Sequence, residues 1–324
     1  MSVVAELRRV SVLLGGGERE VAALNRIDMQ VEAGQILGVV GESGAGKSTL
    51  ARTFLRLLAP DDGAVMLEGS DITGLSGRRL RRLRGRMTMV FRDPRTVLNP
   101  RMTVRALLEE PLRLHTKLRS DARRAAVDVL AARLRLRPAE LDLRPDSLGV
   151  DRLQLVSLGR AIATQPKLLV LDEPTRELDV AAAADLLGLL AQLRRDDGMA
   201  IVLISHDIAA VQPVADRIVV LYLGEIVEEG ATADLLRDPL HPYTQSLLSA
   251  HLPADPARRG RRIRLRGEPP LPDERTPGCG FAPRCPIAET RCRSGTPTLN
   301  LVGADRRVAC LRVLEGSSRI PLSR

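Results

Sequence analysis

The sequence predicts an α/β fold, because short continuous apolar runs each end in a polar loop and helical patterns follow them. The first run is Gln35–Val40, followed by the loop Gly41–Thr49 and by Leu50–Leu58, which predicts a helix. Two further runs, Leu168–Leu171 and Ala200–Ile204, are typical of strands buried on both faces of a parallel sheet. A length of 324 residues allows one large α/β core with accessory pieces.

The loop after the first run has the composition of a phosphate-binding loop, with the residues Gly41, Glu42, Ser43, Gly44, Ala45, Gly46, Lys47, Ser48 and Thr49. Its glycines let backbone N–H groups curl around an anion, and the N-terminus of the next helix adds partial positive charge. We expect Lys47 to reach the β- and γ-phosphates of a nucleotide and the Ser48 hydroxyl to bind Mg²⁺. The flanking strand and helix favour this interpretation over a simple glycine turn. The sequence therefore predicts binding of a nucleoside triphosphate.

Acidic and imidazole side chains follow the other two strand-like runs. Asp172 and Glu173 come directly after the second run, where an aspartate can hold Mg²⁺, usually through water, and a glutamate can orient the attacking water. His206 follows the third run and could hydrogen-bond the γ-phosphate and the water, although alone it would be an ordinary loop histidine. Combined with the phosphate loop, these residues predict hydrolysis as well as binding.

The order of phosphate loop, Asp172–Thr175 and Ser205–Asp207 resembles that of the nucleotide-binding subunits of ABC transporters. Three further segments are similar to the ATPases of oligopeptide and dipeptide importers: Phe91–Val104, Asp238–Ala250 and Pro277–Pro286. The first of these corresponds to the glutamine loop of those ATPases, and the last corresponds to their C-terminal extension. The resemblance covers about residues 5 to 312.

This resemblance implies a P-loop (RecA-like) nucleotide-binding core with an antiparallel β region, an inserted helical subdomain and a cysteine-containing C-terminal extension. We expect the nucleotide-binding domain in residues 1–237, with its antiparallel region within residues 1–90 and its helical subdomain in about residues 91–160. Prolines become dense beyond Asp238, so regular core structure is expected to end there and residues 238–324 to form the extension.

Helical patterns at Val104–Leu114 and Ser120–Leu136 fall in the expected helical subdomain, which is the part that would meet a permease. A further helical pattern, Val180–Leu193, lies in the returning α/β core.

The resemblance also implies an ATPase that uses ATP and Mg²⁺ to power the import of peptides or related small solutes. Its partners would be a paralogous ABC ATPase subunit, two membrane permease subunits and an extracytoplasmic solute-binding protein. It would lie at the cytoplasmic face of the membrane, attached through the permease. The alternative is a scaffold subunit that binds nucleotide without hydrolysing it and supports an active partner. Soluble ABC proteins of translation or repair lack this C-terminal extension.

The signature motif of the family, Leu-Ser-Gly-Gly-Gln, is replaced here by Leu148–Arg152, which reads Leu-Gly-Val-Asp-Arg. In the family, this motif donates hydrogen bonds to the γ-phosphate of ATP held by the opposite subunit. Here the hydroxyl is missing, Val150 is β-branched and Asp151 is negatively charged. Two unit charges about 5 Å apart at an effective dielectric near 20 repel by roughly 3 kcal/mol, a hundredfold effect on affinity. A signature shifted by an insertion is the alternative, but no other Ser-Gly-Gly lies in this region.

Three smaller departures point the same way. Arg92 stands where the family has a glutamine that contacts Mg²⁺ and senses the permease, and a guanidinium cannot ligate a metal. Arg176–Asp179 replaces Ser-Ala-Leu-Asp and keeps the bridging aspartate, Asp179, which completes the expected nucleotide-binding set. No aromatic residue precedes Phe54, so an aliphatic side chain among residues 12–14 is expected where a ring normally stacks on adenine.

The family builds each ATP site from the phosphate loop of one subunit and the signature of the other. The partner's signature would complete this chain's own loop, whereas the altered signature here would face the partner's loop. The sequence therefore predicts an asymmetric heterodimer with one competent site.

Composition argues against nucleic acid and membrane insertion. The net charge is +9, but only three of the 49 basic residues are lysines, which indicates biased base composition rather than selection for a polyanion. Six arginines in residues 78–86 have helical spacing and predict a solvated face, and two Tyr and three Phe leave no aromatic platform for bases. No run of 18 apolar residues occurs and the N-terminus lacks a signal pattern, so we expect a soluble protein and no nucleic-acid partner.

All four cysteines fall in the C-terminal tail: Cys279, Cys285, Cys292 and Cys310. Disulfides are not expected in a reducing cytosol, and none of the spacings is Cys-x-x-Cys. The clustering of all four within such a short tail suggests one site for a soft metal. The resemblance implies a four-cysteine site with a [4Fe–4S] cluster as the leading occupant, and Zn²⁺ or free thiols as alternatives.

Overall fold

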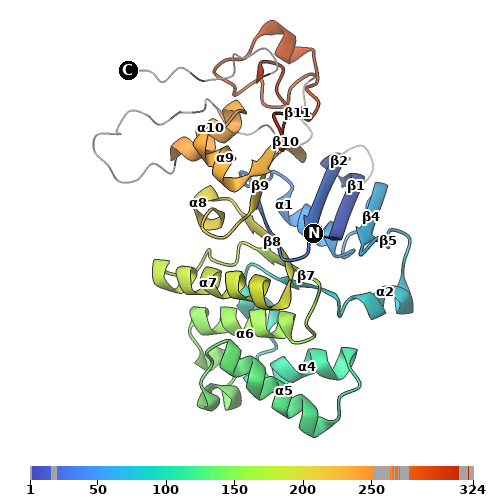
Figure 1. Cartoon of the computed structure of the whole chain (residues 1–324), viewed down its shortest axis with the longest axis vertical. Coiled ribbons are helices and arrows are strands. Elements are labelled where there is room, and N and C mark those ends of the chain that lie inside the picture. The colour runs from blue at the N-terminus through green and yellow to red at the C-terminus, as the bar shows by residue number, and fades with distance from the viewer. Residues whose placement is uncertain are drawn as a thin grey trace.

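The chain is organised around one large sheet whose two faces are both covered (Figure 1). The structure is a computed structural model that describes residues 2–15, 20–250, 263, 265, 267–268, 270, 277–313 and 320. Over these residues, the strand order of the large sheet is β11-β12-β10-β9-β3-β8-β7-β6. Its strands are β3 (Ile36–Val40), β6 (Met87–Val90), β7 (Leu168–Asp172), β8 (Ala200–Ser205), β9 (Arg217–Tyr222), β10 (Glu225–Ala231), β11 (Asn300–Val302) and β12 (Arg306–Val308).

The middle of this sheet is parallel, because β9 pairs with β3, β3 with β8, β8 with β7 and β7 with β6 in the same direction. Alternate residues of β3 enter different cores: Leu37 and Val39 lie on one side, and Ile36 and Val40 on the other. Burial on both faces explains why this strand appears in the sequence as an unbroken apolar run.

A second, antiparallel sheet covers one face of the large one. Over the described residues its strand order is β2-β1-β4-β5, and its strands are β1 (Val3–Leu14), β2 (Val21–Glu32), β4 (Asp62–Leu67) and β5 (Ser70–Asp71). Helix α1 (Lys47–Phe54) contributes Leu50, Ala51 and Phe54 to the core between the two sheets. The expected antiparallel β region is therefore present at the N-terminus.

Helices cover the opposite face and extend beyond it. Helix α4 packs against α5 and α6, and these helices lie at the end of the molecule opposite the C-terminal residues 277–313 (Figure 1). The remaining helices are α2 (Gly77–Leu83), α3 (Pro94–Val97), α4 (Val104–His115), α5 (Ser120–Arg133), η1 (Pro138–Asp142), η2 (Pro145–Ser147), α6 (Val150–Ile162), α7 (Val180–Asp197), α8 (Ile208–Val211), α9 (Thr232–Arg237), α10 (Pro242–Ala250) and η4 (Thr290–Arg293).

The α/β prediction is confirmed, with small differences at helix ends. Helix α1 begins at Lys47, three residues before the expected start, because the phosphate loop leads directly into its first turn. Helix α5 ends at Arg133 rather than at Leu136, and Arg135 has a positive φ of 55° that breaks the helix. The arginines of residues 78–86 are exposed, as their spacing predicts.

The prediction that regular core structure ends at Asp238 is wrong. Helix α10 follows directly, and β12 extends the large sheet by pairing with β10. Tyr243 and Phe281 are fully buried in the main core, so the described part of the tail packs onto the body of the protein. The boundaries at residues 91, 160 and 238 stay predictions. No helix among the residues that the structure describes is long and apolar enough to span a bilayer.

Candidate functional site

The phosphate loop crosses from the end of β3 into α1 at a point where side chains would not fit. A Cβ atom built on Gly41 would lie 2.2 Å from the carbonyl oxygen of Leu221. Gly46 has a φ of +98°, and a Cβ there would lie 2.5 Å from the carbonyl oxygen of Ala23. Gly41 therefore needs glycine for space, and Gly46 needs it for both space and conformation, which suits a loop wrapped closely around an anion.

Lys47 is buried at the base of this loop. Its Nζ atom donates to the carbonyl oxygens of Gly41 at 2.7 Å and of Glu42 at 2.8 Å. Burial lowers the pKa of Lys47, and the carboxylates of Glu173 and Asp172 oppose that shift. The amine is therefore held between the carbonyl oxygens of Gly41 and Glu42, near the acidic residues at the end of β7.

Asp172 and Glu173 lie where the sequence predicts them, at the carboxyl end of β7. Both are nearly buried, and the Glu173 N–H donates to the carbonyl oxygen of Ile204 at 3.0 Å. Glu173 has a positive φ of 50°, a conformation that is rare for residues with a side chain and that clusters at functional sites. Nδ1 of His206 lies 3.3 Å from Oε1 of Glu173, so β7 and β8 bring the two predicted catalytic residues together.

Two arginines also contact the Glu173 carboxylate. Nε of Arg92 lies 3.6 Å from Oε2, and Nη1 of Arg176 lies 3.4 Å from the same oxygen. Both side chains are about half exposed, whereas that of Glu173 is 10 % exposed. The glutamate is therefore engaged by a histidine on one oxygen and by two guanidinium groups on the other.

Lys47, Arg92 and Glu173 line one cavity of about 350 Å³. Its aliphatic side is formed by strand residues that include Leu14 and Val21, where the sequence predicts loss of an aromatic ring. Among the described residues, the lining holds no aromatic side chain and consists of Leu14, Val21, Ala22, Ala23, Ser43, Gly44, Gly46, Lys47, Ser48, Thr49, Arg92, Glu173 and Leu223. Its volume, its glycine-rich wall and the carboxylate of Glu173 at one end fit a nucleoside triphosphate.

Asp179 lies outside that cavity lining. Its carboxylate accepts a hydrogen bond from the Ala182 N–H at 2.8 Å and caps α7, the helix that follows strand β7. Within this chain, Asp179 therefore serves as a helix cap. Its bridging role at an interface with a second subunit stays a prediction.

Leu148–Arg152, the segment predicted to be an altered signature, lies at the start of α6. Gly149 is the N-cap, and Asp151 lies in the first turn with its side chain folded back so that Oδ1 would be 2.7 Å from a Cβ at Gly149. The Asp151 side chain is 53 % exposed, and its carboxylate lies 3.9 Å from Nε of Arg152. A negative charge therefore already occupies the electropositive end of this helix.

The four cysteines come near one another in the described part of the tail. Cys279 and Cys292 are joined by a backbone hydrogen bond of 2.8 Å. Burial raises the pKa of Cys279 to about 11 and that of Cys285 to about 12, and repulsion from the other thiols adds to both shifts. Among the described residues, however, no three His, Cys, Asp or Glu side chains converge tightly enough to hold a single metal ion.

Sequence reasoning missed three residues around the site. Arg176 departs from the family pattern, and that departure was the available signal. Tyr243 and Arg284 both contact Glu42 of the phosphate loop, from 201 and 242 residues away. Local sequence holds no information about contacts across that separation.

Comparison with known proteins agrees with this geometry. The family described as "ABC transporter" matches residues 24–176, and the family described as "Oligopeptide/dipeptide transporter, C-terminal region" matches residues 227–292. The chain is 42 % identical to a di/tripeptide transport ATP-binding protein, DppF, of Pseudomonas aeruginosa, over 91 % of each chain. It is 41 % identical to a probable peptide ABC transporter ATP-binding protein, y4tS, of Sinorhizobium fredii, over 90 % of this chain and 82 % of that one. An oligopeptide transport ATP-binding protein, OppF, of Salmonella typhimurium is 38 % identical over 91 % of this chain and 89 % of its own length.

A solved structure shares the fold. The ATP-binding cassette MJ0796, described as a dimeric post-hydrolysis state bound to ADP and Pi, superposes with a TM-score of 0.65 and 26 % identity. The match covers 70 % of this chain and 98 % of that one. The P-loop core and the predicted family are thus confirmed, and with them the binding of ATP and Mg²⁺ that the family implies. The chain belongs to the ABC transporter family, among the ATP-binding proteins that carry the oligopeptide/dipeptide transporter C-terminal region.

Proposed function

We propose that this chain is a hydrolysing ATPase subunit that powers import of peptides or related small solutes through an ABC transporter. The observation that carries the proposal is Glu173, which lies at the end of β7 beside Lys47 and is contacted by His206. In this role Glu173 orients and polarises the attacking water. His206 contacts both the glutamate and the γ-phosphate and so fixes their relative positions. Ser48 and Asp172 would hold Mg²⁺, which would supply positive charge against the charge that develops on the phosphate.

The working assembly in this proposal is an asymmetric heterodimer with a paralogous ATPase subunit. The partner's signature completes the site on Lys47, while this chain offers Leu148–Arg152 to the partner's phosphate loop. Asp151 supports that asymmetry, because its carboxylate takes the position at the α6 N-terminus that favours an anion. A phosphate brought there meets a like charge and finds no serine hydroxyl, so the partner's site binds ATP poorly.

A second candidate function, a scaffold that binds nucleotide without hydrolysing it, is favoured by the arginines around Glu173. Arg92 and Arg176 both contact the carboxylate oxygen that would otherwise face water. A carboxylate engaged by two guanidinium groups is less free to orient an attacking water. The two functions differ in one measurable property, which is turnover at this chain's own site.

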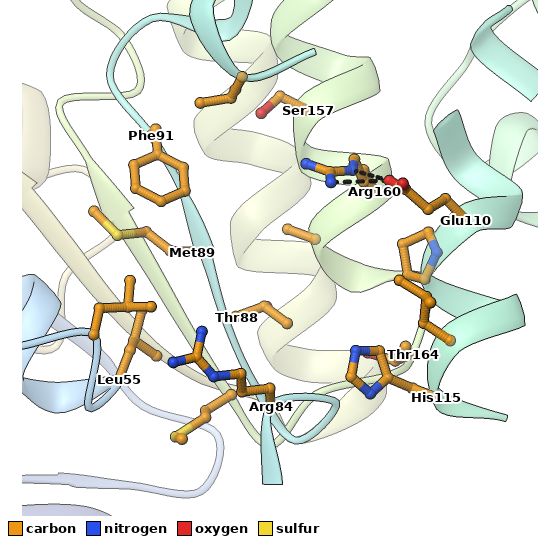
Figure 2. Close-up of a pocket in the computed structure, with 16 residues that line it drawn as sticks. Leu55, Arg84, Thr88, Met89, Phe91, Glu110, His115, Ser157, Arg160 and Thr164 are labelled. Carbon is orange, nitrogen blue, oxygen red and sulfur yellow. Dashed lines mark hydrogen bonds and ion pairs between the residues drawn. The ribbon is translucent and has the colours of Figure 1, made fainter. Parts of the chain in front are cut away.

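The permease contact is proposed for a groove between the core and the helical layer. The groove has a volume of about 290 Å³ and runs between β6 and helices α4 and α6 (Figure 2). Phe91 and Met89 form one wall, and the ion pair of Arg160 with Glu110, at 2.9 and 3.1 Å, forms part of the other. Arg92 follows directly after Phe91, so a short permease helix in this groove would touch the segment that reaches Glu173.

The proposed docking places this chain at the cytoplasmic face of the membrane, with two permease subunits and an extracytoplasmic solute-binding protein completing the transporter. A substitution of Leu114, which lines the groove and is 65 % exposed, tests the contact. Leu114→Asp should reduce recovery of this chain with the permeases while leaving ATP affinity unchanged. Recovery equal to wild type would show that the permease binds elsewhere.

The cysteine site is proposed to hold a [4Fe–4S] cluster rather than Zn²⁺. Zn²⁺ is the alternative, and it would draw four sulfur atoms to about 2.3 Å from one centre. A cluster binds each thiolate through a different iron, so its ligands can stay farther apart. Iron and acid-labile sulfide in anaerobically purified protein would support the cluster, and stoichiometric zinc with no sulfide would reject it.

The functional proposal is tested by transport. The complex of this chain, its partner ATPase, both permeases and the solute-binding protein is reconstituted in liposomes and supplied with labelled di- and oligopeptides. ATP-dependent accumulation that stops with Lys47→Ala in this chain is the expected result. ATP hydrolysis without accumulation of any peptide would reject the substrate class, and unchanged accumulation with Lys47→Ala would reject the motor role.

A further inference from the structure

The phosphate loop is held by two residues from the C-terminal part of the chain, Tyr243 and Arg284. The hydroxyl of Tyr243, in α10, accepts a hydrogen bond from the Glu42 N–H at 2.8 Å. The guanidinium of Arg284 binds the Glu42 carboxylate through two hydrogen bonds, of 2.6 and 3.1 Å. Glu42 is therefore held by both its backbone and its side chain.

This contact is sheltered, so it is more than a surface ion pair. The Arg284 side chain is 7 % exposed and lies 6.0 Å from the ring centre of Tyr222, at a distance typical of a cation–π contact. Phe281 packs against both Tyr222 and Tyr243, with ring centres 5.3 and 5.4 Å apart. Three of the chain's five Phe and Tyr residues thus surround this one connection.

The connection continues to the lysine that binds phosphate. The Glu42 carbonyl oxygen accepts from Nζ of Lys47 at 2.8 Å. The same residue, Glu42, therefore links Arg284 and Tyr243 on one side to Lys47 on the other. Because its N–H is bound to Tyr243, that amide is unavailable to phosphate and serves instead to fix the loop.

We propose that Tyr243 and Arg284 are positioning residues for nucleotide binding. Through their contacts with Glu42, the C-terminal extension holds the phosphate loop in its binding shape. The proposal rests on the ATP-binding function of the loop and adds a part of the chain that the loop motif does not contain. A loop held in its binding shape before ATP arrives loses less conformational freedom on binding. Releasing Glu42 should weaken ATP binding without removing any group that touches the nucleotide.

Arg284 is positioned by the loop that contains Cys279 and Cys285. Arg284 lies between Cys279 and Cys285, and its N–H donates to the carbonyl oxygen of Phe281 at 3.0 Å. The Cys285 N–H donates to the same carbonyl at 2.9 Å, which makes this a tight turn. A change in what holds Cys279 and Cys285 therefore moves Arg284, and through it the phosphate loop.

The first test measures ATP affinity of the full-length chain by calorimetry. Arg284→Gln and Tyr243→Phe should each weaken ATP binding, by about tenfold and about threefold, given the usual strength of charged and neutral hydrogen bonds. Arg237→Gln is the matched control, because Arg237 is a 77 % exposed arginine that lies far along the chain from the loop. Lys47→Ala marks complete loss of binding and separates failure of this proposal from failure of ATP binding itself.

A positioning role predicts a pattern that general destabilisation does not. In the reconstituted complex, Arg284→Gln should raise KM for ATP while leaving kcat within about twofold, and Arg284→Lys should restore part of the affinity. ATP affinity equal to wild type in Arg284→Gln overturns the proposal. If Arg284→Gln lowers the melting temperature of the nucleotide-free protein, Tyr243→Phe decides, and unchanged affinity in that variant overturns the proposal equally.

The cysteine link is tested by a double-mutant cycle. Cys285→Ser should weaken ATP binding, and the double variant with Arg284→Gln should be no weaker than Arg284→Gln alone, because both act through the same contact. Independent effects that multiply in the double variant would overturn this part of the proposal.

Discussion

Two regions of this chain should each form half of an ATP site, and they are built in different ways. Around the phosphate loop, Lys47, Asp172 and Glu173 are buried or nearly so, and each contacts other parts of the fold. At the start of α6, Gly149 caps the helix without a side-chain hydrogen bond, and Asp151 is 53 % exposed. The first region is part of the core, whereas the second is an exposed helix end.

This difference explains how one half can be altered while the other is kept. Replacing Lys47 would leave the carbonyl oxygens of Gly41 and Glu42 without this donor, which costs folding free energy as well as activity. Replacing an exposed residue at a helix N-terminus costs little, and an aspartate there is even favourable for the isolated chain. The signature residues therefore depend on function alone for their identity.

The largest effect is expected from Lys47→Ala, which should remove measurable ATP binding, a loss of at least about a hundredfold, equivalent to about 3 kcal/mol. The lysine supplies a positive charge inside a cavity where little water competes. Lys117→Ala is the control, since Lys117 is exposed. Calorimetric titration of ATP decides, and near-wild-type affinity in Lys47→Ala would mean that the buried half is not the nucleotide site.

A signature restored by Gly149→Ser, Val150→Gly and Asp151→Gly should strengthen the partner's site, by up to about a hundredfold from removal of the charge repulsion. The measurement is ATP turnover of the complex in a Glu173→Gln background, where this chain's own site is silent. The same restored signature combined with loss of the partner's catalytic glutamate is the control and should give no gain. If ATP turnover does not increase in the Glu173→Gln background, the segment Leu148–Arg152 is not what limits the partner's site.

Arg92→Gln should raise turnover by about two- to fivefold, because exposed ion pairs contribute about 0.2–1 kcal/mol and this one competes for the catalytic glutamate. Arg95→Gln, at an exposed arginine in the same segment, is the control. Measured kcat of the complex is the test. A fall in kcat would mean that Arg92 assists the reaction. The site around the phosphate loop would then use a mechanism that differs from that of the family.

The last prediction concerns folding stability rather than ATP binding or turnover, and it follows from a buried histidine next to Tyr243. His241 is completely buried, its Nδ1 accepts from the Tyr243 N–H at 3.1 Å, and burial lowers its pKa to about 3. An unfolded histidine has a pKa near 6.5, so the fold favours the neutral ring. That contribution is complete above about pH 6.5 and is lost as pH falls toward about 3, by up to about 1.4 kcal/mol per pH unit.

Denaturant unfolding between pH 7 and pH 5 measures this slope. His241→Asn keeps an acceptor for the Tyr243 N–H and removes the titration, so its stability should fall less steeply with decreasing pH than that of wild type. Carboxylates titrate equally in both proteins, and the difference between the two slopes isolates His241. Identical slopes would contradict a buried neutral histidine at this position.

The sequence was sufficient for residues whose roles are local and insufficient for contacts across the fold. A glycine-rich turn between an apolar run and a helix specifies its own geometry, so the loop around Lys47 could be predicted. Asp172, Glu173 and His206 follow strands whose carboxyl ends share one edge of the sheet, which also made their meeting predictable. The clamp of Arg284 on Glu42 could not be found, because no local pattern links residues 242 positions apart.

The prediction for the tail failed for a physical reason. Proline density predicted an end to regular structure at Asp238, yet short strands can be held by the edge of an existing sheet without strong propensity of their own. β12 pairs with β10 in this way, and Arg306 and Arg307 of β12 bind the buried carboxylates of Glu228 and Glu229. Tertiary pairing thus overrode the composition.

We propose that this chain's own phosphate loop is the one competent ATP site of the transporter. The most direct measurement is ATP hydrolysis by the co-purified complex, comparing Glu173→Gln in this chain with the matching change in the partner ATPase. The account predicts that Glu173→Gln abolishes turnover, while the partner's change leaves most of it. Turnover that survives Glu173→Gln and disappears with the partner's change would contradict the account and make this subunit a nucleotide-binding scaffold.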